Sequence, residues 1–212
     1  TAKAVEFGDA VLREIIAKYT REAGLRNLER SIASLCRKVA RSHAEGKTKS
    51  VKIEVSDLAE MLGPPKHFPE LTDRTGVAGV ATGLAWTPTG GDILFIESTA
   101  MSGKKGLTLT GSLGDVMKES AQAAFSYIRS HAKDLDVTPS FFDKHDVHIH
   151  VPSGAIAKDG PSAGVALVAS LISLLRNQPL PPEIAMTGEI TLTGRVLPVG
   201  GIREKLLAAR RA

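Results

Sequence analysis

A proline-rich segment divides the sequence into two parts of different composition. Residues 63–76, GPPKHFPELTDRTG, hold three prolines and few regularly spaced apolar residues, which is typical of a linker or domain boundary. Helical patterns precede this segment, whereas β-branched residues are frequent after it. We therefore expect an α+β protein with a small helical unit at residues 1–63, a linker at 64–75 and a larger domain at 76–212.

Two helical patterns and one short strand fill the first part. DAVLREIIAKYT begins at Asp9, a residue type that caps helices, and its apolar members recur at helical spacing. A second stripe of this kind runs over residues 25–43. SVKIEV alternates like a strand, and we expect Ser56 to cap a small helix that ends at Leu62.

Strands and helices alternate in the second part, which predicts a mixed α/β domain. GVAGVATGLAW and DILFIESTAM flank a turn at residues 87–91 and form a pair of strands. A third strand, GLTLTG, precedes a long helix that starts near Asp115, and DVHIHV is a further strand. An apolar helix follows Ser162, and two short strands and a last helix after Gly201 complete the chain.

The composition excludes several classes of protein. The longest apolar run, residues 164–175, is shorter than the roughly twenty residues that cross a bilayer, so no membrane association is expected. Residues 1–8 carry no visible export signal, which favours the cytoplasm. The single cysteine, Cys36, excludes an internal disulfide. The net charge of +4 comes from small, scattered basic clusters, which favours solvated faces but leaves nucleic-acid binding open.

The segment GPSAG, residues 160–164, fits the G-x-S-x-G pattern of the α/β-hydrolase nucleophile elbow. In that fold a strand ends just before the serine, and the catalytic histidine comes later in the chain. Here a loop precedes Ser162, and all six histidines come before it. The α/β-hydrolase interpretation therefore fails. Ser162 is either a helix cap or a nucleophile that uses another base.

A lysine can act as this base when it is buried. The ordinary pKa of a lysine amine is about 10.4, so the amine must be desolvated to be neutral near pH 7. Lys205 follows the pair Gly200-Gly201, which permits close approach of the backbone, and lies on a helical pattern beside Leu206. Because most lysines are solvated surface charges, this alternative stays open for Lys205.

Three successive segments resemble the signature segments of the Lon protease family. They are AKDGPSAG at residues 157–164, MTGEITLTG at 186–194 and LPVGGIREK at 197–205. The resemblance extends through the predicted strand pair and DVHIHV, and so covers nearly all of residues 76–212. It implies a mixed α/β proteolytic domain of the Lon type.

This resemblance assigns roles to three residues. Ser162 would be the nucleophile, Lys205 the general base, and Thr187 a polar neighbour that orients the lysine amine. Relatives commonly have Glu where Ser153 stands and Pro where Ala157 stands. These departures concern loop rigidity and substrate preference, and they leave the dyad intact.

The first part resembles the small helical lid subdomain that follows the nucleotide-binding core in the AAA+ module of this family. The resemblance rests on YTREAGLRNLER, residues 19–30, in which Arg26 occupies the sensor position that faces the ATP phosphates. No G-x-x-x-x-G-K-[ST] phosphate loop occurs in the sequence, so Arg26 is a candidate nucleotide sensor only. Its alternative is a solvated helix arginine.

The resemblance also has implications for the full-length parent protein. ATP and magnesium would be its cofactors, a homo-oligomeric hexameric ring its assembly, and unfolded, damaged or regulatory polypeptides its substrates. Some relatives associate with DNA, so a weak association with DNA stays open. The chain is expected to be cut at both ends, including the C-terminus of the proteolytic domain, and to hold no cofactor itself.

Histidines and carboxylates near these segments are weaker candidates. His148 and His150 share one face of a strand and could begin a zinc site, but no spacing defines a third ligand, and hydrogen-bonded structural histidines are favoured. We therefore predict no metal. Asp159 and Glu189 flank the dyad in sequence, and they either tune it electrostatically or are capping or solvated carboxylates.

The sequence thus predicts the serine endopeptidase portion of an ATP-dependent Lon protease. Ser162 would attack a peptide carbonyl while neutral Lys205 takes its proton, and backbone N–H groups at the helix start could stabilise the oxyanion. An extended substrate would add a strand to an edge of the early sheet. The alternatives are an ATP-independent Lon-like peptidase and a non-catalytic module that binds nucleic acid or protein.

Overall fold

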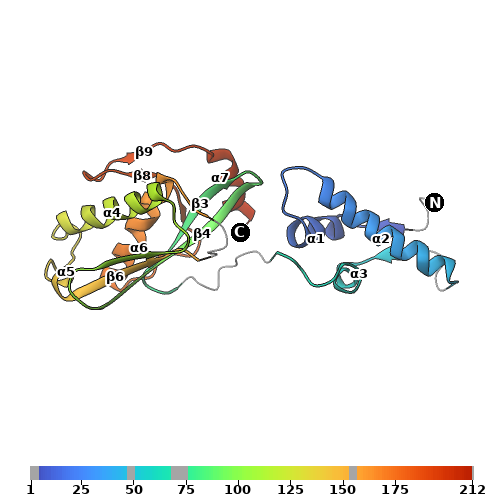
Figure 1. Cartoon of the computed structure of the whole chain (residues 1–212), viewed down its shortest axis with the longest axis horizontal. Helices are drawn as coiled ribbons and strands as arrows, with labels where there is room; N and C mark the ends of the chain where they lie inside the picture. Colours follow the sequence, from blue (N-terminus) through green and yellow to red (C-terminus); the bar gives the residue numbers. More distant parts are fainter. Residues whose placement is uncertain (1–4, 47–50, 68–75, 153–156, 212) are drawn as a thin grey trace. The chain divides into compact units, whose positions relative to one another are not determined.

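The computed structural model describes residues 5–46, 51–67, 76–152 and 157–211. The chain divides between Leu71 and Thr72 into two compact units, which we call the helical unit and the sheet unit (Figure 1). This division falls within the segment that we predicted as a linker, whereas the limits of that linker remain a prediction.

The helical unit combines helices of different length with a pair of short strands. Its elements are β1 (Val5–Phe7), α1 (Asp9–Tyr19), α2 (Arg26–Ala44), β2 (Val51–Ile53), the 3-10 turn η1 (Val55–Asp57) and α3 (Leu58–Leu62). β1 and β2 pair in parallel, and α1, α2, β2 and α3 contribute to one apolar core. That core includes the fully buried side chains of Ile15, Leu35 and Ile53.

Two details of this unit differ from the sequence-based expectation. Gly8 occupies the N-cap of α1, so Asp9 lies inside the first turn instead of capping the helix. Glu54 caps the turn that leads into α3, because its carboxylate and that of Asp57 exchange hydrogen bonds with each other's backbone N–H. Ser56 is therefore not the cap.

The sheet unit contains a mixed five-stranded sheet. Its elements are β3 (Val80–Thr87), β4 (Gly90–Ser102), β5 (Leu107–Thr110), α4 (Asp115–Ser130), α5 (Phe141–Lys144), β6 (His145–His150), the 3-10 turn η2 (Pro161–Ala163), α6 (Gly164–Arg176), β7 (Ala185–Met186), β8 (Glu189–Ile190), β9 (Val196–Leu197) and α7 (Ile202–Arg211). The strand order is β5-β6-β4-β3-β7. β3–β4 and β4–β6 are antiparallel, whereas β5–β6 and β3–β7 are parallel. β8 and β9 form a separate antiparallel pair.

Helices cover the two faces of this sheet differently. α4 and α6 pack on one face, where Ile96 and Ile149 are fully buried with Leu167 in the main core (Figure 1). Side chains alternate along a strand, so Gly91 belongs to the other face of β4. A Cβ atom on Gly91 would overlap the carbonyl of Glu204 in α7. Glycine at this position therefore lets α7 lie directly against β4.

None of the helices in the described part of the chain combines the length and the hydropathy that a bilayer span requires.

Candidate active site

Ser162 lies in the turn η2, immediately before α6. Its side chain is half-buried, and its carbonyl oxygen accepts hydrogen bonds from Gly188 N at 2.9 Å and from Thr187 Oγ1 at 3.2 Å. A 3-10 turn, and not a sharp strand-to-helix turn, therefore presents this serine. The two bonds attach the backbone of Ser162 to the segment between β7 and β8.

Lys205 lies in the first turns of α7 and is only 2% exposed. Its Nζ atom donates a hydrogen bond to Thr187 Oγ1 over 3.0 Å. Burial disfavours the charged ammonium, and this desolvation lowers the pKa of Lys205 below its ordinary value of 10.5. The amine therefore releases its proton more readily than an exposed lysine does, which is the property required of a general base.

Thr187 connects these two residues. Its hydroxyl accepts from the amine of Lys205 and donates to the carbonyl of Ser162, which uses both functions of the hydroxyl group. Ser162 precedes Thr187 by 25 positions in the sequence, and Lys205 follows it by 18. Both residues thus contact the side chain of Thr187. The structure brings together all three residues that the signature segments indicated.

Ser162 and Lys205 line the same pocket, which has a volume of about 470 Å³. Its other lining residues are Trp86, Asp159, Pro161, Glu189, Pro198, Val199, Gly200 and Gly201. The wall therefore combines apolar surface with two carboxylates, one serine and one lysine. Trp86 was missed by the sequence analysis, although the only tryptophan of the chain, placed near the end of a predicted strand, was a usable signal.

Comparison with known proteins identifies the family. Residues 52–212 match the Lon protease (S16) C-terminal proteolytic domain, and residues 1–52 match the Lon protease AAA+ ATPase lid domain. The chain belongs to the Lon protease family. The predicted fold, a lid followed by a Lon-type proteolytic domain, and the assignment to a serine peptidase family are confirmed.

Individual Lon proteases match the whole chain. The Lon protease of Desulfosudis oleivorans is 60% identical over 211 residues, covering 100% of this chain and 26% of that protein. The Lon protease of Koribacter versatilis is 58% identical over 214 residues, with 100% and 26% coverage. The chain thus spans about a quarter of the length of the curated relatives that it matches.

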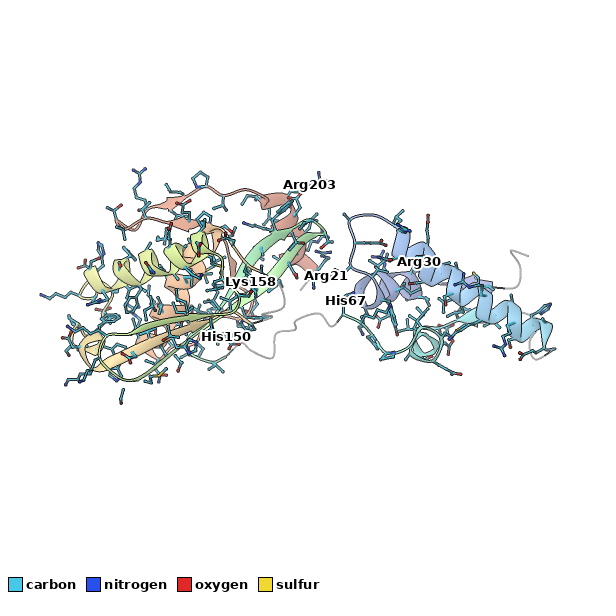
Figure 2. All side chains as sticks on the ribbon, in the orientation of Figure 1. Arg21, Arg30, His67, His150, Lys158 and Arg203 are labelled. Atoms are coloured by element: carbon cyan, nitrogen blue, oxygen red, sulfur yellow. The ribbon has the colours of Figure 1, made fainter. Side chains whose placement is uncertain are left out.

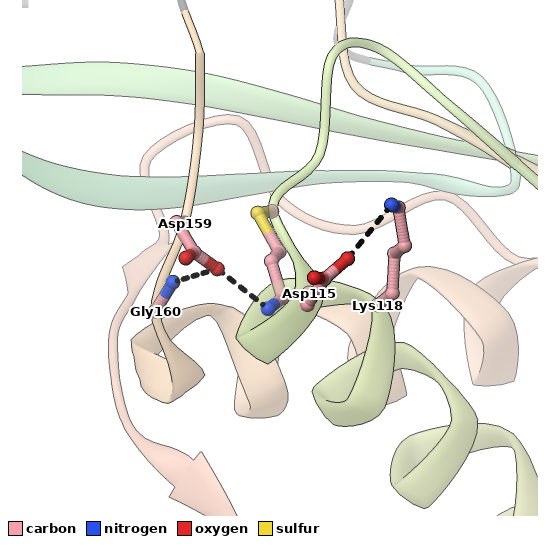
Figure 3. Close-up of polar contacts among 5 residues, drawn as sticks. Asp115, Lys118, Asp159 and Gly160 are labelled. Atoms are coloured by element: carbon pink, nitrogen blue, oxygen red, sulfur yellow. Dashed lines mark hydrogen bonds and ion pairs between the residues drawn. The ribbon is translucent and has the colours of Figure 1, made fainter.

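The two carboxylates of the Lon pocket have different surroundings. Asp159 Oδ1 accepts hydrogen bonds from Met117 N at 3.0 Å and Gly160 N at 2.9 Å, so this residue caps the first turn of α4 (Figure 3). The capping interpretation thus applies to Asp159. Glu189 is half-buried at the start of β8 and lines the pocket.

The N–H groups at the start of α6 are already engaged. Gly164 N donates to the carbonyl of Pro161, and Val165 N donates to that of Gly188 at 3.0 Å. In this conformation neither group is free to bind an oxyanion. An oxyanion in this Lon domain would need other donors or a rearranged 161–163 turn.

The paired histidines hydrogen-bond to a threonine. Thr110 Oγ1 lies 2.8 Å from His148 Nε2 and 2.7 Å from His150 Nδ1. Among residues 5–46, 51–67, 76–152 and 157–211, no group of three or more His, Cys, Asp or Glu side chains is placed to hold a metal. Each histidine thus has one ring nitrogen within hydrogen-bonding distance of Thr110, and the absence of a metal stays a prediction.

The remaining predicted positions lie in the helical unit, at an exposed position of the sheet unit or outside the described residues. Arg26 is exposed at the first residue of α2, in the helical unit. Glu22 accepts hydrogen bonds from the backbone N–H groups of Asn27 and Leu28, and so caps this Lon lid helix. Ala157 is exposed, whereas Ser153 lies outside the described residues.

Proposed function

We propose that this chain hydrolyses peptide bonds with Ser162 as the nucleophile and Lys205 as its general base. The main support is the burial of Lys205. Its amine donates a hydrogen bond to Thr187 over 3.0 Å, and the Thr187 hydroxyl donates one to the carbonyl of Ser162. A solvated lysine would be protonated at neutral pH and could not accept the serine proton. Burial lowers the pKa of the Lys205 amine and so favours the neutral form that this role requires.

The first chemical step forms an acyl-enzyme. Ser162 Oγ attacks the carbonyl carbon of the scissile bond, and its proton passes to the neutral amine of Lys205. As the C–N bond breaks, the Lys205 ammonium gives this proton to the departing amine. In the second step, Lys205 takes a proton from water, hydroxide attacks the acyl carbon, and the ester bond to Ser162 breaks. Ser162 Oγ regains the proton from Lys205.

The substrate is proposed to be an extended, unfolded polypeptide. β7 pairs only with Thr82 and Gly83 of β3, so among the described residues β3 has no strand partner on that side from Leu84 to Thr87. Trp86, within this stretch, also lines the pocket. A peptide that adds a strand there would bring its backbone to Ser162 through main-chain hydrogen bonds, without requiring a particular sequence.

A mutational comparison tests this assignment. In the full-length parent protein, Ser162→Ala and Lys205→Ala should each abolish hydrolysis of casein, and Ser162→Ala should also abolish labelling by a fluorophosphonate. Ser130→Ala is the control, because Ser130 is exposed and its hydrogen bonds among the described residues are local, to Tyr127 and His131. Full activity of the folded Ser162→Ala protein would show that the proposal is wrong. Salt-sensitive DNA binding without any turnover would favour the non-catalytic alternative.

We also propose that ATP and magnesium drive the parent protein, which distinguishes it from an ATP-independent Lon-like peptidase. The support is the match of residues 1–52 to an AAA+ lid, together with Arg26 at the exposed start of α2. Arg26→Ala in the parent should lower its ATPase rate, whereas Arg30→Ala, one turn later, is the matched control. Equal ATPase rates in the two variants would contradict a sensor role for Arg26.

The proposed setting of the parent protein follows from its family. We propose a homohexameric ring in the cytoplasm that degrades unfolded, damaged or regulatory proteins. Sedimentation of the parent with and without ATP measures the assembly directly. A monomer under all conditions would contradict the ring.

A weak association with DNA has a specific structural support. Arg26, Arg30, Arg37 and Arg41 are all exposed on α2, and their spacing places them on one face of this helix (Figure 2 labels Arg30). Such a row of guanidinium groups suits a phosphate backbone. Anisotropy of labelled duplex DNA at increasing salt tests it. Arg30→Glu with Arg37→Glu should weaken binding more than the same charge change at the exposed sheet-unit residues Lys133 and Arg195.

A further inference from the structure

The segment just before the nucleophile is paired like a short strand. Lys158 N donates to Ser112 O over 3.0 Å, and Gly114 N donates to Lys158 O over 2.7 Å, which forms a parallel bridge between Lys158 and Leu113. Residues 111–114 connect β5 to α4. The backbone four residues ahead of Ser162 is thus attached to this connection.

The side chain of Lys158 adds a second attachment. Its Nζ atom donates to the carbonyl oxygens of Gly111 at 3.1 Å and of Val151 at 3.5 Å. Gly111 follows the last residue of β5, and Val151 follows the last residue of β6, so the ammonium group joins the ends of two adjacent parallel strands. Figure 2 shows Lys158 within the sheet unit. Hydrogen bonds from a charged donor are stronger than neutral ones.

The next residue extends this attachment to α4. The carboxylate of Asp159 caps α4 through Met117 N (Figure 3). The absence of a side chain at Gly114 makes room for this carboxylate, because a Cβ atom there would overlap it. Ser120 of α4 also donates to Pro161 O over 3.4 Å. The residues from Lys158 to Pro161 are therefore held on one side by β5, β6 and α4, while Ser162 is held on the other by Thr187 and Gly188.

We propose that Lys158 is a positioning residue for the peptidase reaction: its ammonium, held by the strand-end carbonyls of Gly111 and Val151, sets the position from which Ser162 reaches Lys205. This inference rests on the proposed function. Without the ammonium, the carbonyls of Gly111 and Val151 lose a donor. The segment then keeps its backbone bridge, the Asp159 cap on α4 and the hydrogen bond from Ser120, but loses its side-chain attachment to the ends of β5 and β6. The Ser162 hydroxyl would then be misplaced relative to its base, and small displacements of a nucleophile cost large factors in rate.

The test uses the full-length parent protein and three lysine variants. Lys158→Met removes the charge and keeps the length, Lys158→Arg keeps both charge and donors, and Lys118→Met is the matched control. Lys118 pairs with Asp115 in the first turn of the same helix α4, over 3.0 Å, and is half-exposed (Figure 3). The readouts are the second-order rate of fluorophosphonate labelling, kcat and KM for a fluorogenic peptide, and the unfolding midpoint.

Lys158→Met should lower the labelling rate and kcat by about 10-fold to 100-fold, the range for a displaced catalytic group, while KM changes less than about 3-fold. Lys158→Arg should recover most of the labelling rate, and Lys118→Met should resemble the wild type. Where methionine prevents folding, Lys158→Gln gives the same comparison.

Three results would overturn the inference. The first is a wild-type rate of labelling in Lys158→Met, and the second is an equal loss of labelling rate in Lys118→Met. The third is a loss of labelling rate in Lys158→Met that follows the fall of the unfolding midpoint and is not recovered in Lys158→Arg. Each leaves the Ser162–Lys205 proposal standing. Absence of labelling in the wild type would instead refute that proposal, and this inference with it.

Discussion

Lys205 Nζ lies 3.0 Å from Thr187 Oγ1, and Lys205 is only 2% exposed. A buried amine without a hydrogen-bond partner is unfavourable, and the threonine hydroxyl supplies one that carries no charge. A carboxylate in its place would favour the ammonium and would raise the pKa of the lysine. The neutral partner thus leaves desolvation as the dominant influence on this pKa.

Thr187→Val should reduce activity while leaving the fold intact. Valine has nearly the shape of threonine, but it can neither accept from Lys205 nor donate to the carbonyl of Ser162. Loss of a buried hydrogen bond of about 1–3 kcal/mol corresponds to a fall in kcat/KM of roughly 5-fold to 150-fold. Peptide hydrolysis by the full-length protein measures it. Thr187→Ser, which keeps the hydroxyl, is the control, and equal activity of the valine and serine variants would contradict the positioning role.

The pH dependence of activity should report the lowered pKa of Lys205. Only the neutral amine can take the serine proton, so kcat/KM should rise with pH and level off at a pH below the ordinary lysine pKa of 10.5. The measurement is a pH series with a fluorogenic peptide. A plateau reached only above 10.5 would show that Lys205 is not the base, or is not buried in the working enzyme.

The stability of the sheet unit should depend on pH through the same residue. Between the lowered pKa and 10.5, the unfolded chain binds a proton at Lys205 that the native chain does not, so the free energy of unfolding rises with pH in this window. Below the lowered pKa the cost of burying the ammonium is fully present. Lys205→Met should remove this part of the pH dependence, as measured by urea unfolding followed through Trp86 fluorescence. Identical pH slopes in wild type and variant would contradict it.

Ile149→Ala should destabilise the sheet unit by about 2–5 kcal/mol, because it leaves a cavity in the main core. Ile149 is fully buried in β6. Met101→Ala, on the neighbouring strand β4 where Met101 is 46% exposed, should change stability by about 0.5 kcal/mol or less. Urea unfolding followed through Trp86 fluorescence distinguishes the two variants, and equal midpoints would contradict the described packing.

Gly91→Ala should affect both stability and catalysis. A Cβ atom there would overlap the carbonyl of Glu204, so α7 must move and carry Lys205 with it. We expect a loss of about 1–3 kcal/mol in stability and a lower kcat. Gly24→Ala, where a Cβ atom would have no neighbour within 4 Å, is the control. Wild-type kcat in Gly91→Ala would indicate that α7 does not pack closely on β4.

Much of the fold was predictable because its signals are local. The alternation in DVHIHV placed Val147, Ile149 and Val151 on one face, and all three are buried. Linker composition and helical stripes likewise depend on neighbouring residues. β1 was not predicted, since a strand of three residues is too short to show a period and is stabilised by pairing with the distant β2.

The sequence by itself determined the candidates for the chemistry, because the Lon signature segments contain Ser162, Thr187 and Lys205 in order. It could not determine their environment. Burial of Lys205, capping of α4 by Asp159 and the place of Trp86 in the pocket were decided by the tertiary structure. Each results from contacts between segments far apart in the chain. Desolvation is a property of such contacts, and the pKa of a lysine falls when the folded chain removes its water.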